Sequence, residues 1–297
     1  MPENKIIFSL TSSIELAKKV AKLSDIELGE SEVVKFSDGE VMARCLSEVT
    51  GKTCYIVQST TAPSTETIFE IVVFVDSLKN AGAKDVILIA PYYGYSRQDR
   101  VARKGEPITA KVVGSIIENA GVSKVISVDL HTQQIQGFFS IPVVNIETSV
   151  LFGKYFAKRF EELGINHSDV VVVSPDHGSA NRGRDVCSEL NGASLAVIDK
   201  RRPAPNESEV TNVVGDVNGK VCLIIDDIVD TCGTINNAVE ALLNKGAKSI
   251  YVAVTHAVIS RGEIDSRVKE FVTTDTVEKE HKGAKVLSVA EIISQSM

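Results

Sequence analysis

The chain alternates short apolar runs with longer amphipathic stretches along most of its length. The apolar runs are rich in valine and isoleucine and lack strict alternation, which is typical of strands buried on both faces of a sheet. Such strands are predicted at Lys5–Ser9, Thr53–Gln58, Asp85–Ala90, Lys124–Val128, Val170–Ser174, Ser194–Ile198, Val221–Ile225 and Ser249–Thr255. Helical spacing of apolar residues predicts helices at Ile14–Leu23, Ile68–Ala81, Lys111–Ala120, Val150–Leu163 and Ile235–Lys245. The alternation predicts an α/β fold with mainly parallel sheets flanked by helices.

The length and composition allow two domains. A chain of 297 residues with 43% hydrophobic residues can fill two separate cores. The segment AGAKDVILIAPY also resembles KGAKSIYVAVTH in its order of helix end, Gly-Ala-Lys and strand. This single internal similarity is weak support for two related halves. We expect them to meet near Glu147–Val150, which gives domains of residues 1–148 and 149–297.

Polar clusters directly follow several predicted strands. They are QST after Val57, PYYGYSRQD after Ala90, DLH after Val128 and PDHG after Ser174. Ligands of parallel α/β sheets bind at the carboxyl ends of the strands. We therefore expect the functional residues to gather at these ends.

The segment Val221–Thr234 carries the strongest chemical signal. Its apolar run is followed by two adjacent carboxylates, Asp226 and Asp227. A loop comes next, made of Asp230, Thr231, Cys232, Gly233 and Thr234. Because this loop leads into a predicted helix, unpaired N–H groups and the helix dipole favour a bound anion there. The acids cannot attract a phosphate, so we expect them to hold sugar hydroxyls or a metal ion beside it. The site suits a phosphorylated sugar.

The segment FSDGE, residues 36–40, could recognise a purine. Phe36 could stack on the ring, while Asp38 and Glu40 could accept hydrogen bonds from an exocyclic amine. Asp-Gly is also common in turns, so an ordinary surface turn with Phe36 in the core is the alternative.

The segment YYGYSRQDR, residues 92–100, follows a buried strand and combines tyrosines with arginines. Arg97 and Gln98 could contact nucleotide phosphates or the edge of the base. Isolated charges after a strand usually face solvent, and that alternative stays open from these residues alone.

Two further strand ends carry possible ligands. His131 lies in DLH, where a lone histidine is more often a structural hydrogen-bonding group than a metal ligand. Asp176 lies in SPDHGSANRGR, where backbone N–H groups near Gly178 and Ser179 could cradle a diphosphate. The alternative for this segment is a plain Pro-Asp turn into a helix.

The densest positive patch is DKRRPAP, residues 199–205, with Lys200, Arg201 and Arg202 in a row. Such a run is usually a solvated loop. The prolines predict an exposed, mobile loop. Diphosphoryl transfer, however, depends on cations that stabilise the transferring group.

Together these motifs resemble the ribose-phosphate diphosphokinase family, which has the type I phosphoribosyltransferase fold. The resemblance runs from Lys5 to about Ser294. It implies two phosphoribosyltransferase-like domains and a Mg²⁺-dependent transfer of the diphosphoryl group of ATP to ribose 5-phosphate, giving phosphoribosyl diphosphate and AMP. The family usually has a glycine where Ser179 stands, which leaves the effect of this serine on the diphosphate loop open.

The resemblance also implies roles for single residues. It implies that Lys200 and Arg202 are catalytic and that a metal ion binds at His131 and Asp176. The residues implied in ATP binding are Phe36, Asp38, Glu40, Arg97 and Gln98. Those implied in ribose 5-phosphate binding are Asp226, Asp227 and Asp230–Thr234. In the family FSDGE acts across a subunit interface. We therefore expect a homo-oligomer, a hexamer by resemblance.

Composition bears on nucleic-acid binding, cellular compartment and membrane insertion. A net charge of −7 without a long basic stripe argues against nucleic-acid binding. The 5 cysteines are scattered in no disulfide or zinc pattern, which favours the cytoplasm. We expect no signal peptide and no membrane span, and the sequence contains no GxxxxGK[ST] loop.

Two alternative functions remain open from the sequence. A phosphoribosyltransferase would share the sugar-phosphate loop but would not need FSDGE and GYSRQDR. A non-catalytic assembly partner of the same fold would not need intact KRR, DLH and DDIVDT segments.

Overall fold

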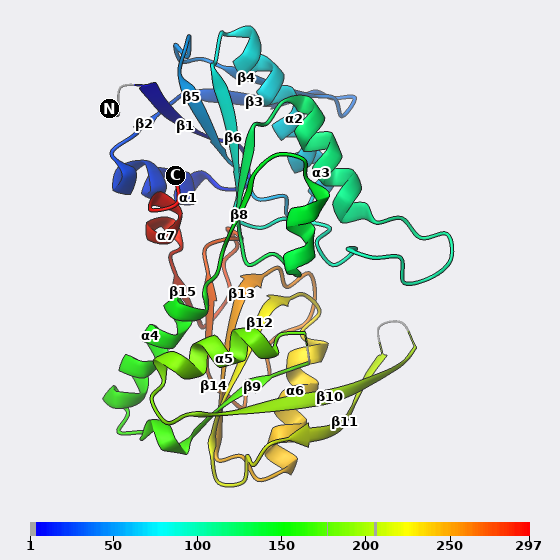
Figure 1. The fold of residues 1–297 in the computed structure, drawn as a ribbon, viewed down its shortest axis with the longest axis vertical. Coiled ribbons are helices and arrows are strands. Elements are labelled where there is room, and N and C mark those ends of the chain that lie inside the picture. The colour runs from blue at the N-terminus through cyan, green and yellow to red at the C-terminus, as the bar shows by residue number, and fades with distance from the viewer. Residues whose placement is uncertain (1–3, 177, 205–206) are drawn as a thin grey trace. The chain divides into compact units, whose positions relative to one another are not determined.

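The structure is a computed structural model. It describes residues 4–176, 178–204 and 207–297, except for the side chains of residues 200–211. The chain forms two compact units (Figure 1). Unit 1 comprises the described residues of Met1–Ile146 with Asp275–Glu278 and Ser288–Met297, and unit 2 comprises Glu147–Thr274 with Lys279–Leu287. The domain boundaries expected from the sequence, residues 1–148 and 149–297, stay a prediction.

Unit 1 is built on a parallel sheet with the strand order β2-β1-β5-β6-β7-β8. Its strands are β1 (Lys5–Ser9), β2 (Glu27–Leu28), β5 (Thr53–Val57), β6 (Asp85–Ala90), β7 (Lys124–Val128) and β8 (Val143–Ile146). Its helices are α1 (Ile14–Ser24), α2 (Ser64–Asn80), α3 (Thr109–Ala120), the 3-10 helix η2 (Gln133–Phe138) and α7 (Ala290–Ser294). A separate antiparallel hairpin joins β3 (Ser31–Lys35) to β4 (Val41–Cys45).

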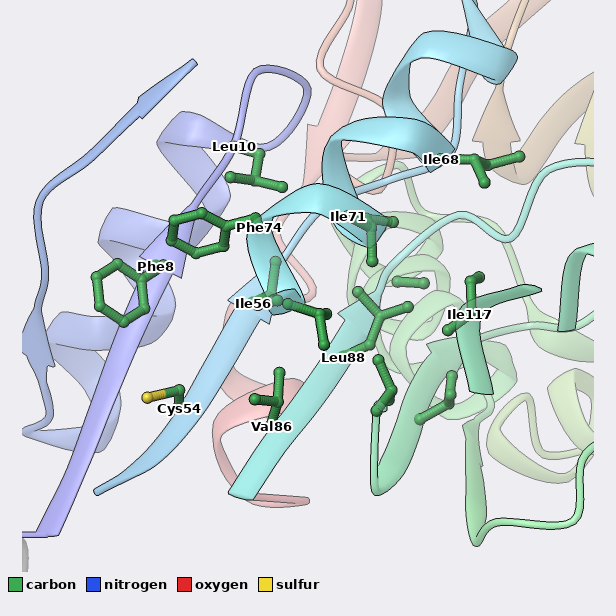
Figure 2. Close-up of a cluster of buried hydrophobic side chains, with 14 of the residues drawn as sticks. Phe8, Leu10, Cys54, Ile56, Ile68, Ile71, Phe74, Val86, Leu88 and Ile117 are labelled. Atoms are coloured by element: carbon green, nitrogen blue, oxygen red, sulfur yellow. The ribbon is translucent and has the colours of Figure 1, made fainter. Parts of the chain in front are cut away.

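The core of unit 1 lies between this sheet and helices α2 and α3. Figure 2 shows side chains from β1, β5 and β6 directed toward the apolar face of α2. Phe8 and Phe74 meet edge to face with ring centroids 5.3 Å apart. Burying one such ring contributes about 1.5–3 kcal/mol, so these contacts hold the sheet rigidly beneath the loops that follow its strands.

Unit 2 is built on a sheet with the strand order β11-β10-β9-β12-β13-β14-β15. Its strands are β9 (Val170–Ser174), β10 (Ser194–Ala204), β11 (Glu207–Val214), β12 (Val221–Val229), β13 (Ser249–Ala257), β14 (Val268–Thr274) and β15 (Ala284–Leu287). The neighbouring pairs are parallel apart from β10 and β11, which form an antiparallel hairpin. The helices are α4 (Ser149–Glu162), α5 (Ala180–Glu189), α6 (Gly233–Asn244) and the 3-10 helix η3 (His167–Asp169).

The two faces of the unit 2 sheet are covered by different helices. Successive residues of a strand point to opposite faces, so each strand feeds two cores. In β12, Cys222 and Ile224 join the core that includes residues of α6, whereas Leu223 and Ile225 join the core that includes residues of α4 and α5. This explains why the strands read as continuous apolar runs in the sequence.

The predicted α/β class and each of the eight predicted strands and five predicted helices are present, with small shifts at their ends. Three strands run further than predicted, among them β13, which ends at Ala257. β12 extends to Val229, because its later residues pair with β13, and β10 extends to Ala204, because it pairs with β11. The segment Asp199–Ala204 is therefore a strand rather than the irregular loop that its prolines predicted.

Candidate functional site

Asp226 and Asp227 occupy the centre of the unit 2 sheet at its carboxyl edge. β12 pairs with β9 up to Ile224 and continues beside β13, where Asp226 lies opposite Val254. The two aspartates thus extend past the end of β9. They are 7% and 5% exposed. Alternation along β12 directs Asp226 toward the α6 face and Asp227 toward the α5 face.

Arg182 of α5 lies against the second aspartate. Its Nη1 is 3.7 Å from Asp227 Oδ1, and both side chains are largely buried. Gly183 lets α5 pack closely on the sheet, since a Cβ there would lie 2.7 Å from Leu195 Cδ1. Arg182 lies within the segment SPDHGSANRGR, but the sequence analysis assigned it no role.

The negative charges of Asp227 and Asp176 disfavour ionisation of Asp226 at this edge. The pKa of Asp226 is raised well above its ordinary value, chiefly by burial and then by the negative charges of Asp227 and Asp176, while Arg182 acts in the opposite direction. A cation or the hydroxyl groups of a ligand would relieve this repulsion. The edge is therefore suited to bind a polyhydroxyl compound or a metal complex.

The loop after β12 leads directly into α6. Cys232 is its buried N-cap residue and adopts a left-handed conformation with φ of 62°. The first helical hydrogen bond shown runs from Asn236 N to Cys232 O over 2.9 Å, so the amides of the three residues before Asn236 precede the helical ladder. Thr231, Gly233 and Thr234 are exposed. The loop thus ends at a helix N-terminus, where the helix dipole favours an anion.

A second loop, residues 258–265, braces this first one from β13. Ser260 donates hydrogen bonds from its N and Oγ to Asp230 Oδ1. Gly262 has φ of +81°, and a Cβ there would lie 2.9 Å from the Thr231 oxygen. Asp230 therefore supports the loop conformation, a task that the sequence could not distinguish from ligand binding.

Asp176 follows β9 at the same sheet edge. Its Oδ1 accepts hydrogen bonds from Ser179 N and Ser179 Oγ, each over 3.0 Å. Ser179 is the N-cap residue of α5, so this segment is a turn into a helix as well as a loop at a strand end. The Ser179 hydroxyl is bonded within the protein instead of facing outward as a donor for phosphate.

In unit 1 the segment after β6 begins buried and ends exposed. Tyr93 is buried and donates from its hydroxyl to Ala110 O over 2.8 Å. Gly94 packs on the segment after β5, where Gly94 N donates to Thr60 Oγ1 over 2.5 Å. Arg97 and Gln98 come next and are exposed. This places their side chains on a rigid support at the carboxyl edge of the sheet.

Neighbouring residues hold two side chains of this segment, those of Gln98 and Asp99, through hydrogen bonds. Gln98 Oε1 accepts a hydrogen bond from Thr109 Oγ1 over 2.6 Å. Thr132 Oγ1 donates to Asp99 Oδ2 over 2.9 Å, which ties the segment to the residues after β7. Tyr95 and Asp129 both adopt positive φ values, 62° and 40°. Such strained backbone is often retained at functional sites.

His131 follows β7 and is exposed, two residues after the buried Asp129. β5, β6 and β7 are neighbours in the sheet, so the polar segments after them share one edge, as the sequence predicted. His131 belongs to unit 1, whereas Asp176 belongs to unit 2.

The FSDGE segment forms the tip of the β3–β4 hairpin. Phe36 N donates to Glu40 O over 2.8 Å, and Asp38 Oδ1 accepts from Glu40 N over 3.1 Å. Gly39, with φ of 94°, makes the turn. The Phe36 side chain is 48% exposed. The alternative in which this ring fills the core is therefore wrong.

Lys200 and Arg202 lie on β10 near the end of the hairpin, which Figure 1 shows reaching beyond the other strands of unit 2. The register of β10 with β11 shifts between Asp199 and Lys200 and again between Arg201 and Ala204. The side chains of both predicted catalytic residues lie outside the described part of the structure.

Comparisons with known proteins identify the family. Residues 5–121 match the N-terminal domain of ribose phosphate pyrophosphokinase, and residues 148–288 match the phosphoribosyl transferase domain. The ribose-phosphate pyrophosphokinase of Bacillus subtilis is 45% identical, covering 99% of this chain and 93% of its own. That of Fusobacterium nucleatum is 43% identical, with 99% and 94% covered. The phosphoribosylpyrophosphate synthetase of Mycobacterium smegmatis superposes with a TM-score of 0.88 at 34% identity, with 99% and 97% covered.

The chain belongs to the ribose-phosphate pyrophosphokinase family.

Membership in the ribose-phosphate pyrophosphokinase family confirms the predicted family, the α/β fold class and the reaction, so the protein is an enzyme. The comparisons do not test single residues, and the assigned site residues remain predictions. Within the described residues, none of the helices combines the length and apolar character that a membrane crossing requires.

The donor groups suit Mg²⁺. In the described part of the chain no group of three or more His, Cys, Asp or Glu side chains is arranged to hold a metal ion. Mg²⁺ keeps several of its waters and takes few protein ligands, so a cage is not required. The carboxylates of Asp176, Asp226 and Asp227 offer oxygen donors, and their mutual repulsion would favour a cation. The oxygen donors at this edge of unit 2 are therefore of the kind that Mg²⁺ prefers.

Proposed function

We propose that this protein transfers the diphosphoryl group of ATP to the 1-hydroxyl of ribose 5-phosphate, giving phosphoribosyl diphosphate and AMP. The observation that carries the proposal is the buried aspartate pair at the end of β12, next to a loop that opens α6, in a chain related to ribose-phosphate pyrophosphokinases over its whole length.

Ribose 5-phosphate would bind at the carboxyl edge of unit 2. The amides and hydroxyls of Asp230–Thr234 would hold the 5-phosphate at the N-terminus of α6, where the helix dipole favours an anion. Asp226 and Asp227 would accept hydrogen bonds from the ribose hydroxyls. The raised pKa of Asp226 supports this role, because hydroxyl donors stabilise a buried carboxylate that lacks water.

ATP would be bound by the segments of unit 1. Arg97 would contact the phosphates and Gln98 the nucleotide, while Phe36 would stack on adenine with Asp38 and Glu40 near its amine. The exposure of Phe36 supports this role, since an aromatic ring at a hairpin tip is open to a partner. By resemblance the hairpin would act in a neighbouring subunit, so we propose a homo-oligomer, a hexamer in the family pattern.

The anomeric hydroxyl of ribose 5-phosphate would attack the β-phosphorus of ATP in line. The new bond joins the sugar oxygen to the β-phosphorus, the bond between the α- and β-phosphoryl groups breaks, and AMP leaves with the electron pair. Lys200 and Arg202 would stabilise the charge on the transferring group.

By resemblance, Mg²⁺ would be held by His131 and Asp176. Asp226 and Asp227 lie at the same sheet edge of unit 2 as Asp176 and add negative charge there. When bound, the ion would neutralise charge on the ATP phosphates. Histidine is an atypical ligand for Mg²⁺, and His131 rests on the family resemblance alone. We place the enzyme in the cytoplasm, which fits the absence of disulfides among its cysteines.

Product analysis tests this function. The purified chain is incubated with Mg²⁺ and ATP, with and without ribose 5-phosphate, and nucleotides are separated by ion-exchange chromatography. We expect AMP only when both substrates are present. Absence of AMP would favour a phosphoribosyltransferase or a non-catalytic partner, and formation of ADP in its place would indicate a simple kinase.

A further inference from the structure

Two buried serines surround Asp176 at the end of β9. Ser174 ends the strand and is fully buried, and Ser179 caps α5 and is 5% exposed. Their hydroxyl oxygens are 2.8 Å apart. Ser174 Oγ also lies 2.6 Å from the main-chain oxygen of Asp176. The three residues form one hydrogen-bonded group.

The hydroxyl of Ser179 is committed to this group. A hydroxyl has one proton to donate, and an ionised carboxylate is the strongest acceptor within its reach. We therefore assign the Ser179 proton to Asp176 Oδ1, 3.0 Å away. The single Ser174 proton is then shared between the main-chain oxygen of Asp176 and Ser179 Oγ, both of which lie within hydrogen-bonding distance. The amide of Ser179 donates to the same Oδ1 over 3.0 Å.

This arrangement fixes the rotation of the Asp176 carboxylate. Both hydrogen bonds from Ser179 end on Oδ1, and among the described residues no donor is shown to Oδ2. The charge of Asp176 is close enough to Asp226 to raise the pKa of that residue, so the carboxylate belongs to the same edge as the aspartate pair. One oxygen is thus held by the protein while the other remains for a ligand.

We propose that Ser179 is a positioning residue, whose hydroxyl holds the Asp176 carboxylate in the orientation in which Oδ2 can bind a divalent cation. The inference rests on the proposed metal-binding role of Asp176. Alanine or glycine at this position keeps the amide donor but removes the hydroxyl, so the carboxylate would lose one of its two restraints. Outer partners of this kind typically change metal affinity by about 10–100-fold.

Metal binding by the purified protein tests this role without depending on turnover. Mn²⁺, used as the probe, is titrated into the wild type and variants, and free Mn²⁺ is followed by its electron paramagnetic resonance signal. We expect Ser179→Ala to weaken Mn²⁺ binding about tenfold, and Ser179→Thr, which keeps a hydroxyl, to restore part of it. Ser188→Ala is the matched control, since Ser188 is an exposed serine of the same helix. Thermal unfolding checks that each variant is folded.

A double variant separates positioning from a general disturbance of the loop. Asp176→Asn should abolish the tighter Mn²⁺ binding, and Ser179→Ala should then have no further effect. If Asp176→Asn weakens binding but Ser179→Ala does not, the inference is wrong and the metal role of Asp176 stands. If Asp176→Asn has no effect, both are wrong, while AMP formation still decides the reaction independently.

Discussion

Asp226 is a carboxylate whose ionisation the surrounding protein opposes. Its pKa is raised by burial first and by Asp227 and Asp176 next. The unfolded chain releases this proton in the ordinary carboxyl range, but the folded protein retains it to higher pH. The group therefore costs no stability at low pH, and folding stability falls as pH rises toward the raised pKa.

We expect Asp226→Asn to stabilise the ligand-free fold while it abolishes ribose 5-phosphate binding. The midpoint of thermal unfolding, measured with a chelator present, should rise by roughly 2–5 °C at neutral pH. The gain should shrink as pH falls toward the ordinary carboxyl range. Asp185→Asn, at an exposed position of α5, is the control and should change little. A gain independent of pH would contradict the burial of a charge as its cause.

Arg182 is expected to matter for the sugar substrate and not for ATP. Removing its guanidinium in Arg182→Gln leaves Asp227 without the cation beside it, 3.7 Å away in the structure. The KM for ribose 5-phosphate should rise about tenfold, which corresponds to about 1.4 kcal/mol, with the KM for ATP unchanged. Arg184→Gln on the exposed face of the same helix should behave like the wild type. Equal effects on both KM values would refute this role.

The residues that the sequence revealed are those that lie next to one another in the chain. Asp226, Asp227 and the loop to Thr234 form one contiguous motif, so their chemistry could be predicted directly. Arg182 acts through a contact between a helix and a strand that is distant in sequence. The Ser179 hydroxyl bonds within its own turn, and its direction depends on how that turn folds. No local pattern distinguishes such a residue from an ordinary polar residue of a helix.

Strands and helices were predicted where their own composition decides their structure. The sequence ended the strand before Asp226, since charged residues are rare inside strands, yet β12 runs to Val229 because β13 provides its hydrogen-bonding partners. The same reason extends β10 along β11. Short strands such as β2 and β15 were missed, because they depend on a neighbouring strand more than on β-forming residues.

The loop after β6 depends on a close approach of two backbone segments. A Cβ at Gly94 would lie 2.2 Å from the Thr60 oxygen, a backbone atom that cannot move aside easily. We expect Gly94→Ala to cost about 2 kcal/mol and to lower the midpoint of thermal unfolding by roughly 4–8 °C. It should also raise the KM for ATP by displacing Arg97. Gly137→Ala is the control, since its added Cβ would meet no atom within 4 Å beyond its own local backbone and its chain neighbours. Equal midpoints for both variants would contradict the close packing.

Across the whole chain, the alternation of apolar runs and helices was enough to predict the fold class and a two-part organisation. It could not predict that residues near the C-terminus return to unit 1. Asp275 pairs with Lys19 over 2.8 Å, and Glu278 Oε1 accepts from Leu16 N over 2.6 Å at the start of α1. These contacts join positions far apart in sequence, so only the folded chain shows them.

A shared active site would make two impaired variants complement each other. Lys200→Ala should lower turnover by roughly 10³ or more, since it removes a charge that stabilises the transferring group. Phe36→Ala should weaken ATP binding without unfolding the chain, because the ring is exposed. If the hairpin acts in a neighbouring subunit, coexpressed variants form some intact sites, about a quarter in a random assembly. Activity no greater than the sum of the separate variants would contradict a shared site.

The central claim is that two phosphoryl groups move together to the sugar. The most direct measurement uses ATP radiolabelled at either the β- or the γ-phosphorus, with ribose 5-phosphate and Mg²⁺, followed by separation of the pentose product. We predict that both labels enter that product in equal amounts and that AMP remains unlabelled. Transfer of the γ-label alone, or of neither label, would contradict the account.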